Sequence, residues 1–338
     1  MFGRFVLRRL LVTMPLLVGV TLVTFAVSHL IPADPLMAIL PERAANDPQT
    51  VQMYRERWGL DRSLPEQYLF YLRNLLRGDL GESYTSRRPV VQDLRERFPA
   101  TVELALAAML YAVTLGLTLG VLSAIWYERW IDHVARLVAL VGVSLPVFWL
   151  GLLALQLFYA NLRLLPGPGR IDPRLTAPPF RTGFYTIDSL LAGDWSLFLN
   201  VLSHLVLPGM VLGSYAMGII ARMTRSALLD VLGADYIRTA RAKGLAERRV
   251  ILVHALRNAL IPTVTVIGLT FGSLLAGAVL TETIFAWPGI GRYAVDAAMK
   301  LDLPAVLGVT LLIAVVYVVV NFLTDVLYGM LDPRIRVS

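Results

Sequence analysis

Cysteine is absent from this chain of 338 residues, and only 16% of the residues are charged. The absence of cysteine excludes a disulfide framework, a thiolate zinc site and a cysteine nucleophile. Globular proteins usually carry about 25% charged residues, whereas here 57% of the residues are hydrophobic. So apolar a chain has too little polar surface to cover two water-facing domains, the number that its length would suggest for a soluble protein.

The sequence also lacks the motifs of common enzymes. Its only two lysines, Lys243 and Lys300, do not complete the G-x-x-x-x-G-K-[ST] loop that would hold the phosphates of ATP. It has no H-E-x-x-H or G-x-S-x-G motif, and its four histidines show no metal-ligand spacing. We therefore expect that the chain is not an enzyme and that it holds no cofactor and no metal ion.

What the sequence does contain is a set of long stretches without charge. Six of them exceed 20 residues, namely 10–33, 104–127, 137–162, 195–221, 258–281 and 303–324. A helix of about 20 apolar residues crosses a bilayer core of roughly 30 Å and satisfies its own backbone hydrogen bonds there. The sequence therefore predicts an all-α polytopic membrane protein with six transmembrane helices.

The first stretch admits a second interpretation, because three arginines precede it as in a signal peptide. Its apolar run is longer than the usual 7–15 residues of such a peptide. In addition, Ser28-His29-Leu30 is not a small-x-small cleavage site. We expect this stretch to be a transmembrane helix.

Basic residues predict the orientation of the chain. With the N-terminus in the cytoplasm, the cytoplasmic segments carry a net +9, of which +5 lies in residues 222–257. This follows the rule that basic residues flank spans on the cytoplasmic side. Residues 31–98 carry ten arginines outside, balanced by ten carboxylates, and so long a segment is largely exempt from the rule. Both termini are then cytoplasmic, and the basic excess marks a membrane face rather than a nucleic-acid surface.

The segment after the first stretch predicts a short amphipathic helix outside the membrane. Ser63 and Glu66 fit a capping box, and Gly78 fits a C-terminal cap. Four side chains fall on one face: Tyr68, Tyr71, Leu72 and Leu75. The helix is expected to pack on the outer ends of the bundle or to lie in the interface, or to contact a soluble partner, and these alternatives are compatible. The proline- and glycine-rich chain between the third and fourth stretches predicts an irregular loop.

The loop between the fourth and fifth stretches is the most informative segment. Residues 235–244 read D-Y-I-R-T-A-R-A-K-G, which predicts a helix that Asp235 caps and that Gly244 ends in a left-handed conformation. A second helix is expected from about Glu247. The small residues Ala240 and Gly244 would let the backbone of another protein approach closely. Taken singly, each arginine also fits a plain basic linker.

This loop resembles the "EAA" loop of importer-type ABC transporter permeases, the helix pair that docks into a groove of the ATPase subunit. The resemblance rests on Thr239-Ala240, the glycine at 244 and Ile261-Pro262. The glutamate that names the motif is Arg238 here, a departure shared by the peptide-transporter branch. Further stretches along the chain resemble the dipeptide/oligopeptide/nickel group, namely 8–10, 31–35, 78–81, 222–226, 281–285, 287–289 and 332–336.

The resemblance implies a division of the chain and a function. Residues 1–31 would form the N-terminal tail and first helix, 32–98 an extracytoplasmic segment, and 99–338 a five-helix ABC permease transmembrane domain with its coupling loop at 222–258. The expected function is import of dipeptides or short oligopeptides across the bacterial inner membrane, with ATP hydrolysed on partner subunits. Nickel or glutathione import remains an alternative within the class. An ion-coupled secondary transporter is the alternative of another class, although it would favour carboxylates near mid-membrane.

The resemblance also implies partners and contact residues. The partners are a second permease subunit forming a heterodimer, two ABC ATPase subunits, an extracytoplasmic peptide-binding protein and the lipid membrane, but no nucleic acid. The expected contact residues with the ATPase are Asp235, Tyr236, Arg238, Thr239, Ala240, Arg241, Lys243, Gly244, Ile261 and Pro262.

Polar residues in or near the spans are candidates for the transport pathway. An aspartate at the centre of a helix costs roughly 2.5–3.5 kcal/mol on insertion scales, so a retained one usually faces protein or water. The candidates are His29, Glu103, His204, Asn321 and Asp325. Glu103 and Asp325 lie near span ends, where they could instead simply reach the interface.

Overall fold

The computed structural model describes residues 11, 14–26, 49, 52–53 and 62–331. Within them every regular element is helical, and the one β-bridge, Glu82 to Pro89, is isolated. The longer helices are α5 (Leu64–Leu76), α6 (Val90–Ile125), α7 (Trp130–Ser144), α10 (Trp195–Leu232), α13 (Leu256–Gly277), α15 (Ile290–Met299) and α16 (Leu303–Leu331). The shorter ones are α8 (Val147–Ala154), α9 (Tyr185–Leu191), α11 (Asp235–Ala242), α12 (Glu247–Arg249) and α14 (Val279–Ile284), with π-helices η1 (Leu155–Asn161) and η2 (Val250–Ala255).

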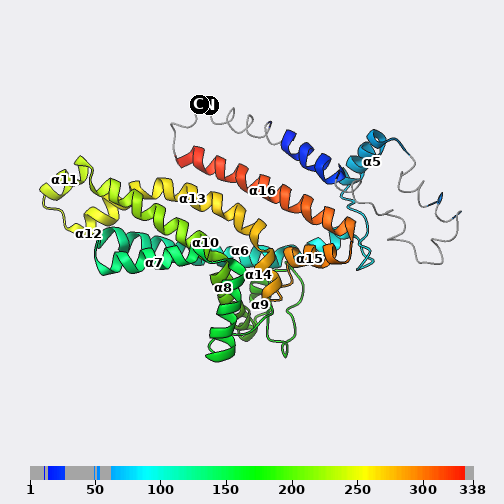
Figure 1. Ribbon diagram of the computed structural model, residues 1–338, viewed down its shortest axis with the longest axis horizontal. Helices are drawn as coiled ribbons and strands as arrows, with labels where there is room; N and C mark the ends of the chain where they lie inside the picture. Colours follow the sequence, from blue (N-terminus) through cyan, green and yellow to red (C-terminus); the bar gives the residue numbers. More distant parts are fainter. Residues whose placement is uncertain (1–10, 12–13, 27–48, 50–51, 54–61, 332–338) are drawn as a thin grey trace.

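The body of the molecule consists of four long helices that lie side by side, α6, α10, α13 and α16 (Figure 1). Helix α10 packs on α6, α7 and α13, and α13 packs on α16. In the part of the chain that the structure describes, four helices are long and apolar enough to cross a membrane, and a fifth span results if the bent pair α7 and α8–η1 counts as one. An apolar helix of intermediate length, Met14–Ala26, precedes them. The all-α, multi-pass prediction is therefore confirmed, and the number six stays a prediction.

The third uncharged stretch is not one straight helix. Its two halves meet at an angle of 111°, and Leu145 at the break has the extended ψ of 133°. Pro146 explains the break, because a proline disfavours the helical conformation of the residue before it and donates no backbone hydrogen bond. Helix α8 turns away from α7 at this point and packs against α10 and α14 (Figure 1).

Helices α6 and α10 approach closely because glycine lies between them. A Cβ atom at Gly116 would come within 2.8 Å of Ile220, and one at Gly120 within 2.6 Å of Thr224. Leu104 and Val201 are fully buried in the same cluster. Because α10 packs closely on α6 and also on α7 and α13, it is the central helix of the bundle.

Helix α5 confirms the expected capping box. The Glu66 carboxylate accepts hydrogen bonds from the backbone N–H (3.1 Å) and the hydroxyl (2.9 Å) of Ser63. Gly78 follows the helix with a φ of +77°. The hydroxyls of Tyr68 and Thr21 are 2.9 Å apart, and the Tyr68 ring meets Phe25 edge-on. The structure thus places α5 against the first helix, and a contact with a soluble partner stays a prediction.

A corner at the α14–α15 end of the long helices buries several charges. We call residues 279–303 the corner. The Glu282 carboxylate is fully buried and accepts hydrogen bonds from the Thr101 hydroxyl (2.6 Å) and the Arg292 backbone N–H (2.9 Å). The indole N–H of Trp287 donates to the carbonyl of Ala100 at 2.8 Å. These bonds attach the corner to α6.

Asp302 secures the other side of the corner. It is fully buried and accepts hydrogen bonds from the Ser83 hydroxyl (2.6 Å) and the Thr85 backbone N–H (2.9 Å). Burial, followed by the charge of Asp302, raises the pKa of Tyr84 to about 12. The Tyr84 phenol therefore stays neutral up to a higher pH than an ordinary tyrosine, so it adds no second negative charge beside Asp302.

Candidate functional site: an elbow and a groove

Helices α11 and α12 with η2 form an elbow, residues 235–255, that joins α10 to α13. Helix α11 begins at Asp235, and its N-cap is Ala234. The prediction that Asp235 caps this helix is therefore wrong. Asp235 instead forms an ion pair with Arg238. Gly244 ends the helix with a φ of +75°, and its backbone N–H donates a hydrogen bond to the carbonyl oxygen of Arg241 at 2.9 Å. The predicted left-handed glycine and the helix start at Glu247 are both confirmed.

The inner face of the elbow rests on the chain's own core. Ile237 is fully buried and Ala240 is 8% exposed, in a cluster with Leu228, Val250 and Ala255. The small side chain at Ala240 therefore allows α11 to approach its own bundle. The expectation that Ala240 faces another protein is wrong, because its face of α11 is the one that anchors the elbow.

The outer face of the elbow is open and charged. Arg238, Thr239, Lys243 and Gly244 are exposed, and Arg241 forms an ion pair with Glu247 (2.6 Å) across the glycine turn. A Cβ atom built at Gly244 would meet no atom within 4 Å. Nothing in the described chain thus covers this surface, and its charges are free to be contacted.

Tyr236 ties the elbow to the following long helix. Its hydroxyl accepts a hydrogen bond from the Asn258 side chain of α13 at 2.8 Å, while the tyrosine stays 44% exposed. Ile261 and Pro262 lie farther along, within α13. Helix α11 is therefore connected to α13 both through η2 and through this hydrogen bond.

A groove of about 420 Å³ runs between α10 and α13. Its α10 wall consists of Leu212, Tyr215, Ala216 and Ile219. Its α13 wall consists of Val266, Leu269, Thr270, Ser273, Leu274 and Gly277, and Val147 lies at its edge. The members of each wall recur every three to four residues, which is one stripe of a helix. The groove is apolar apart from three hydroxyls, and no charged residue lines it.

The walls of the groove are the two helices that the elbow joins. Between the groove and the elbow these helices touch, where the fully buried hydroxyls of Thr224 and Thr263 lie 3.5 Å apart. Gly268 faces Thr324 on the other side of α13. The contact between Thr224 and Thr263 therefore lies between the elbow and the groove.

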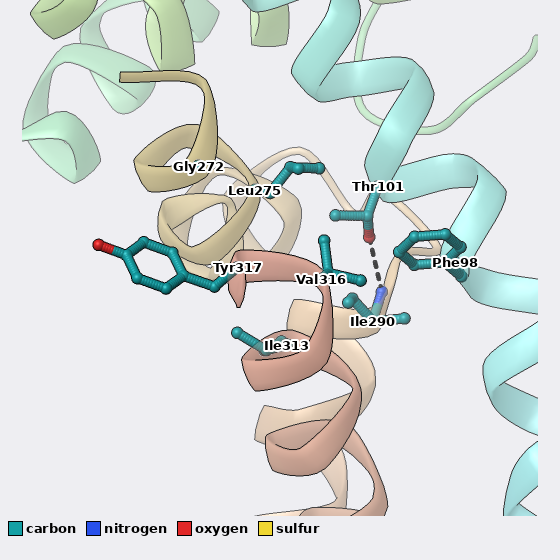
Figure 2. A pocket seen from close by; sticks show the side chains of 8 residues that line it. All are labelled: Phe98, Thr101, Gly272, Leu275, Ile290, Ile313, Val316 and Tyr317. Atoms are coloured by element: carbon teal, nitrogen blue, oxygen red, sulfur yellow. Dashed lines mark hydrogen bonds between the residues drawn. The ribbon is translucent and has the colours of Figure 1, made fainter. Parts of the chain in front are cut away.

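A second cavity near α13 is too small to hold a solute. It lies on the α16 side, has a volume of about 10 Å³, and is lined by the residues shown in Figure 2. The Thr101 hydroxyl in it accepts a hydrogen bond from the Ile290 backbone N–H at 2.9 Å. A volume of this size holds about one water molecule, so we do not assign a transport role to it.

The candidate pathway residues that the structure describes do not line the groove. Glu103 is 5% exposed and accepts hydrogen bonds from Arg170 (2.6 and 2.9 Å) and from the Thr186 hydroxyl (2.6 Å). His204 is buried, with its Nδ1 2.9 Å from the carbonyl of Asn200 in its own helix. Asn321 is half-buried on α16. His29 and the side chain of Asp325 lie outside the described residues.

Comparison with known proteins agrees with this architecture. The model of the family described as "Binding-protein-dependent transport system inner membrane component" matches residues 116–337, and the model of its N-terminal region matches residues 1–105. The chain belongs to this permease family.

Its relatives cover nearly the whole chain. The permease is 51% identical over 332 residues, 98% of each chain, to the di/tripeptide transport system permease protein of Pseudomonas aeruginosa (strain UCBPP-PA14). It is 49% identical over 317 residues, 94% of this chain and 93% of the relative, to the probable D,D-dipeptide transport system permease protein of Escherichia coli (strain K12). The glutathione transport system permease protein of Salmonella choleraesuis (strain SC-B67) is 39% identical over 332 residues, 98% of each chain.

Sequence reasoning missed the lining of the groove in this permease. Tyr215, Thr270 and Ser273 are uncharged and lie in apolar helices, so a search for charged or histidine residues passes over them. A usable signal existed on α13, where Thr270 and Ser273 are three residues apart and so share a face. Which face of α13 would be open depends on the packing of α10 and α16, and the sequence does not show that packing.

Proposed function

We propose that the chain is the permease subunit of an ATP-driven importer of dipeptides or short oligopeptides. The observation that carries this proposal is the near full-length identity of about 50% to permeases named for di- and tripeptide transport. The permease named for glutathione transport is less similar, at 39%. A dipeptide or a tripeptide other than glutathione is therefore favoured as the cargo, and nickel stays a weaker alternative within the class.

The elbow is the proposed contact with an ATPase subunit. Its exposed outer face is formed by Tyr236, Arg238, Thr239, Lys243 and Gly244. It is connected to α13 through η2 and through the hydrogen bond between Tyr236 and Asn258. A partner can shift the balance between two packings of the groove walls only by binding them with different affinities. Closure of the ATPases on ATP would supply that difference, and hydrolysis would occur on them rather than on this chain.

We place the elbow and both termini in the cytoplasm and count six spans. The basic excess of residues 222–257 supports this orientation. The first helix and the bent pair α7 and α8–η1 supply the two spans beyond the four long helices. In this arrangement residues 1–31, 32–98 and 99–338 are the N-terminal helix, the extracytoplasmic segment and the permease domain, in the bacterial inner membrane.

The complete transporter would contain a second, distinct permease subunit, two ATPase subunits and an extracytoplasmic peptide-binding protein. This chain supplies one side of a pathway that the second permease completes. The open groove of the single chain is consistent with such a half-pathway.

Uptake by the reconstituted assembly tests the proposal. Vesicles holding all subunits should accumulate a labelled dipeptide only when ATP and the binding protein are both present. Labelled glutathione and nickel ions in the same vesicles serve as competing cargoes. Uptake of the dipeptide by this chain alone, driven by a proton gradient, would refute the proposal, and preferential uptake of glutathione or nickel would refute the assignment of the cargo.

A further inference from the structure

Within residues 211–221 of α10, the α10–α13 groove is the open side of the helix. Among residues 211–221 of α10, only Tyr215 and Ile219 are not buried, and both line the groove. Elsewhere in this stretch α10 is closed by its neighbours, with Gly213 against Ala108 and Gly218 against Ala139. Tyr215, which is 48% exposed, therefore interrupts a buried stretch of α10 at the groove that it lines.

The groove has the size and the composition of a solute site. Its volume of about 420 Å³ falls within the roughly 300–1,000 Å³ of ligand sites, which are mostly apolar with a few polar groups. The Tyr215 hydroxyl makes no hydrogen bond within the described residues, so it can donate one and accept one. Thr270 donates to its own helix at Val266 (2.8 Å) but keeps its acceptor capacity, and Ser273 is exposed beside it.

From these observations we infer that Tyr215, Thr270 and Ser273 line the water-filled path of the cargo, a short peptide whose amides and termini bond to these hydroxyls as it passes. The absence of charged residues from the lining suits such a cargo, because a fixed charge would hold one peptide terminus tightly and slow its release. This inference rests on the proposed function, since it takes a peptide as the cargo. It moves the pathway away from His204, Glu103 and Asn321, which do not line the groove.

The lack of cysteine makes this inference directly testable. Single-cysteine variants Ser273→Cys and Thr270→Cys would be placed in the complete transporter in nanodiscs, where both faces are accessible. The matched control is Leu140→Cys on α7, which is 55% exposed and does not line the groove. Each is treated with a charged methanethiosulfonate and with a lipid-soluble maleimide, and modification of this chain is measured by mass spectrometry.

We expect the charged reagent to modify Ser273→Cys and Thr270→Cys at least about tenfold faster than Leu140→Cys. Saturating dipeptide with its binding protein and ATP should slow that modification several-fold, and Leu140→Cys should react mainly with the maleimide. Reaction of Ser273→Cys with the maleimide alone would overturn the inference, since a lipid chain would then fill the groove. Failure to react with either reagent would also overturn it, since a helix of the second permease would then cover the site.

A functional variant separates this inference from the proposed function. Tyr215→Phe retains the ring and removes the free hydroxyl, so dipeptide uptake should fall several-fold while Leu140→Cys transports as the parent does. Unchanged uptake by Tyr215→Phe would contradict a role for the hydroxyl. If the parent transporter carries no dipeptide but the cysteines still react with the charged reagent, the cargo assignment fails and the water-filled path stands.

Discussion

The corner and the elbow lie at opposite ends of the long helices, and they treat charge in opposite ways (Figure 1). In and beside the corner, Glu282 and Asp302 are fully buried and Glu103 is 5% exposed, each with several hydrogen-bond partners. At the elbow the side chains of Asp235 and Arg238 are 90% and 71% exposed. The charged groups of the corner are buried in internal hydrogen bonds, whereas those of the elbow form ion pairs that stay exposed to solvent.

The difference in burial indicates where the substitution of a charged residue should lower the stability of the permease and where it should not. Leaving one partner of a buried ion pair alone costs about 3–5 kcal/mol, whereas an exposed pair contributes about 0–1 kcal/mol. Substitutions at the corner should therefore act on stability, and substitutions at the elbow should act on association with a partner. The predictions below run from the largest expected effect on stability to the smallest.

Arg170→Ala should be the most damaging change. It would leave the Glu103 carboxylate buried without the cation that donates to it at 2.6 and 2.9 Å, at a cost of about 3–5 kcal/mol. Thermal unfolding of the detergent-solubilised transporter measures the loss, and Arg174→Ala in the exposed part of the same loop is the control. Adding Glu103→Gln to Arg170→Ala should restore part of the stability. Equal stability of Arg170→Ala and Arg174→Ala would show that the buried pair does not hold this loop.

Gly289→Ala should be the next most damaging. A Cβ atom there would overlap the Glu282 carboxylate at the start of α15, and such overpacking costs about 1–3 kcal/mol. The control is Gly19→Ala in the first helix, where a Cβ atom would meet no atom within 4 Å. The melting temperature should fall for Gly289→Ala only. If both variants melt alike, the corner can relax around Glu282.

The sequence predicted the elbow well because its signals are local. Gly244 ends α11 and Glu247 begins the next helix, and both follow from residues within a few positions of each other. The capping box at Ser63 and the apolar character of the long helices were predictable for the same reason. Two details differed. The N-cap is Ala234 rather than Asp235, and Ala240 is buried, because a periodic pattern defines the faces of a short helix but not which face the bundle covers.

The corner and the groove were not predictable, since they depend on contacts between distant segments. Glu103 and Arg170 are 67 positions apart, and Thr101 and Glu282 are 181 apart. A buried glutamate and a pathway glutamate look alike in the sequence, so Glu103 entered the candidate list. Pro146 signals a bend, but the uncharged run around it has the length of a single span and predicts a straight helix.

Gly244→Asp should leave the permease folded and abolish its association with the ATPase. The site has room for the side chain in the single chain, so the cost to stability is about 1–2 kcal/mol for a left-handed residue that is not glycine. The matched control is Gly193→Asp, which has a similar φ of +71° and equally open surroundings away from the elbow. Co-purification of the ATPase should be lost for Gly244→Asp and retained for Gly193→Asp. Co-purification with both variants would show that the elbow is not the docking surface.

Tyr236→Phe should have the smallest effect on stability and still impair coupling. It removes one partly exposed hydrogen bond to Asn258, worth about 0.5–1.5 kcal/mol, and leaves α11 seated on Ile237. If that bond carries movement from α11 to α13, peptide uptake per ATP hydrolysed should fall several-fold although the ATPase still co-purifies. Tyr127→Phe is the control, because the Tyr127 hydroxyl makes no hydrogen bond within the described residues and its ring under Arg225 is retained. An unchanged ratio of uptake to hydrolysis in Tyr236→Phe would mean that this hydrogen bond does not carry the movement, which would then pass through η2 and the buried contacts of Ile237.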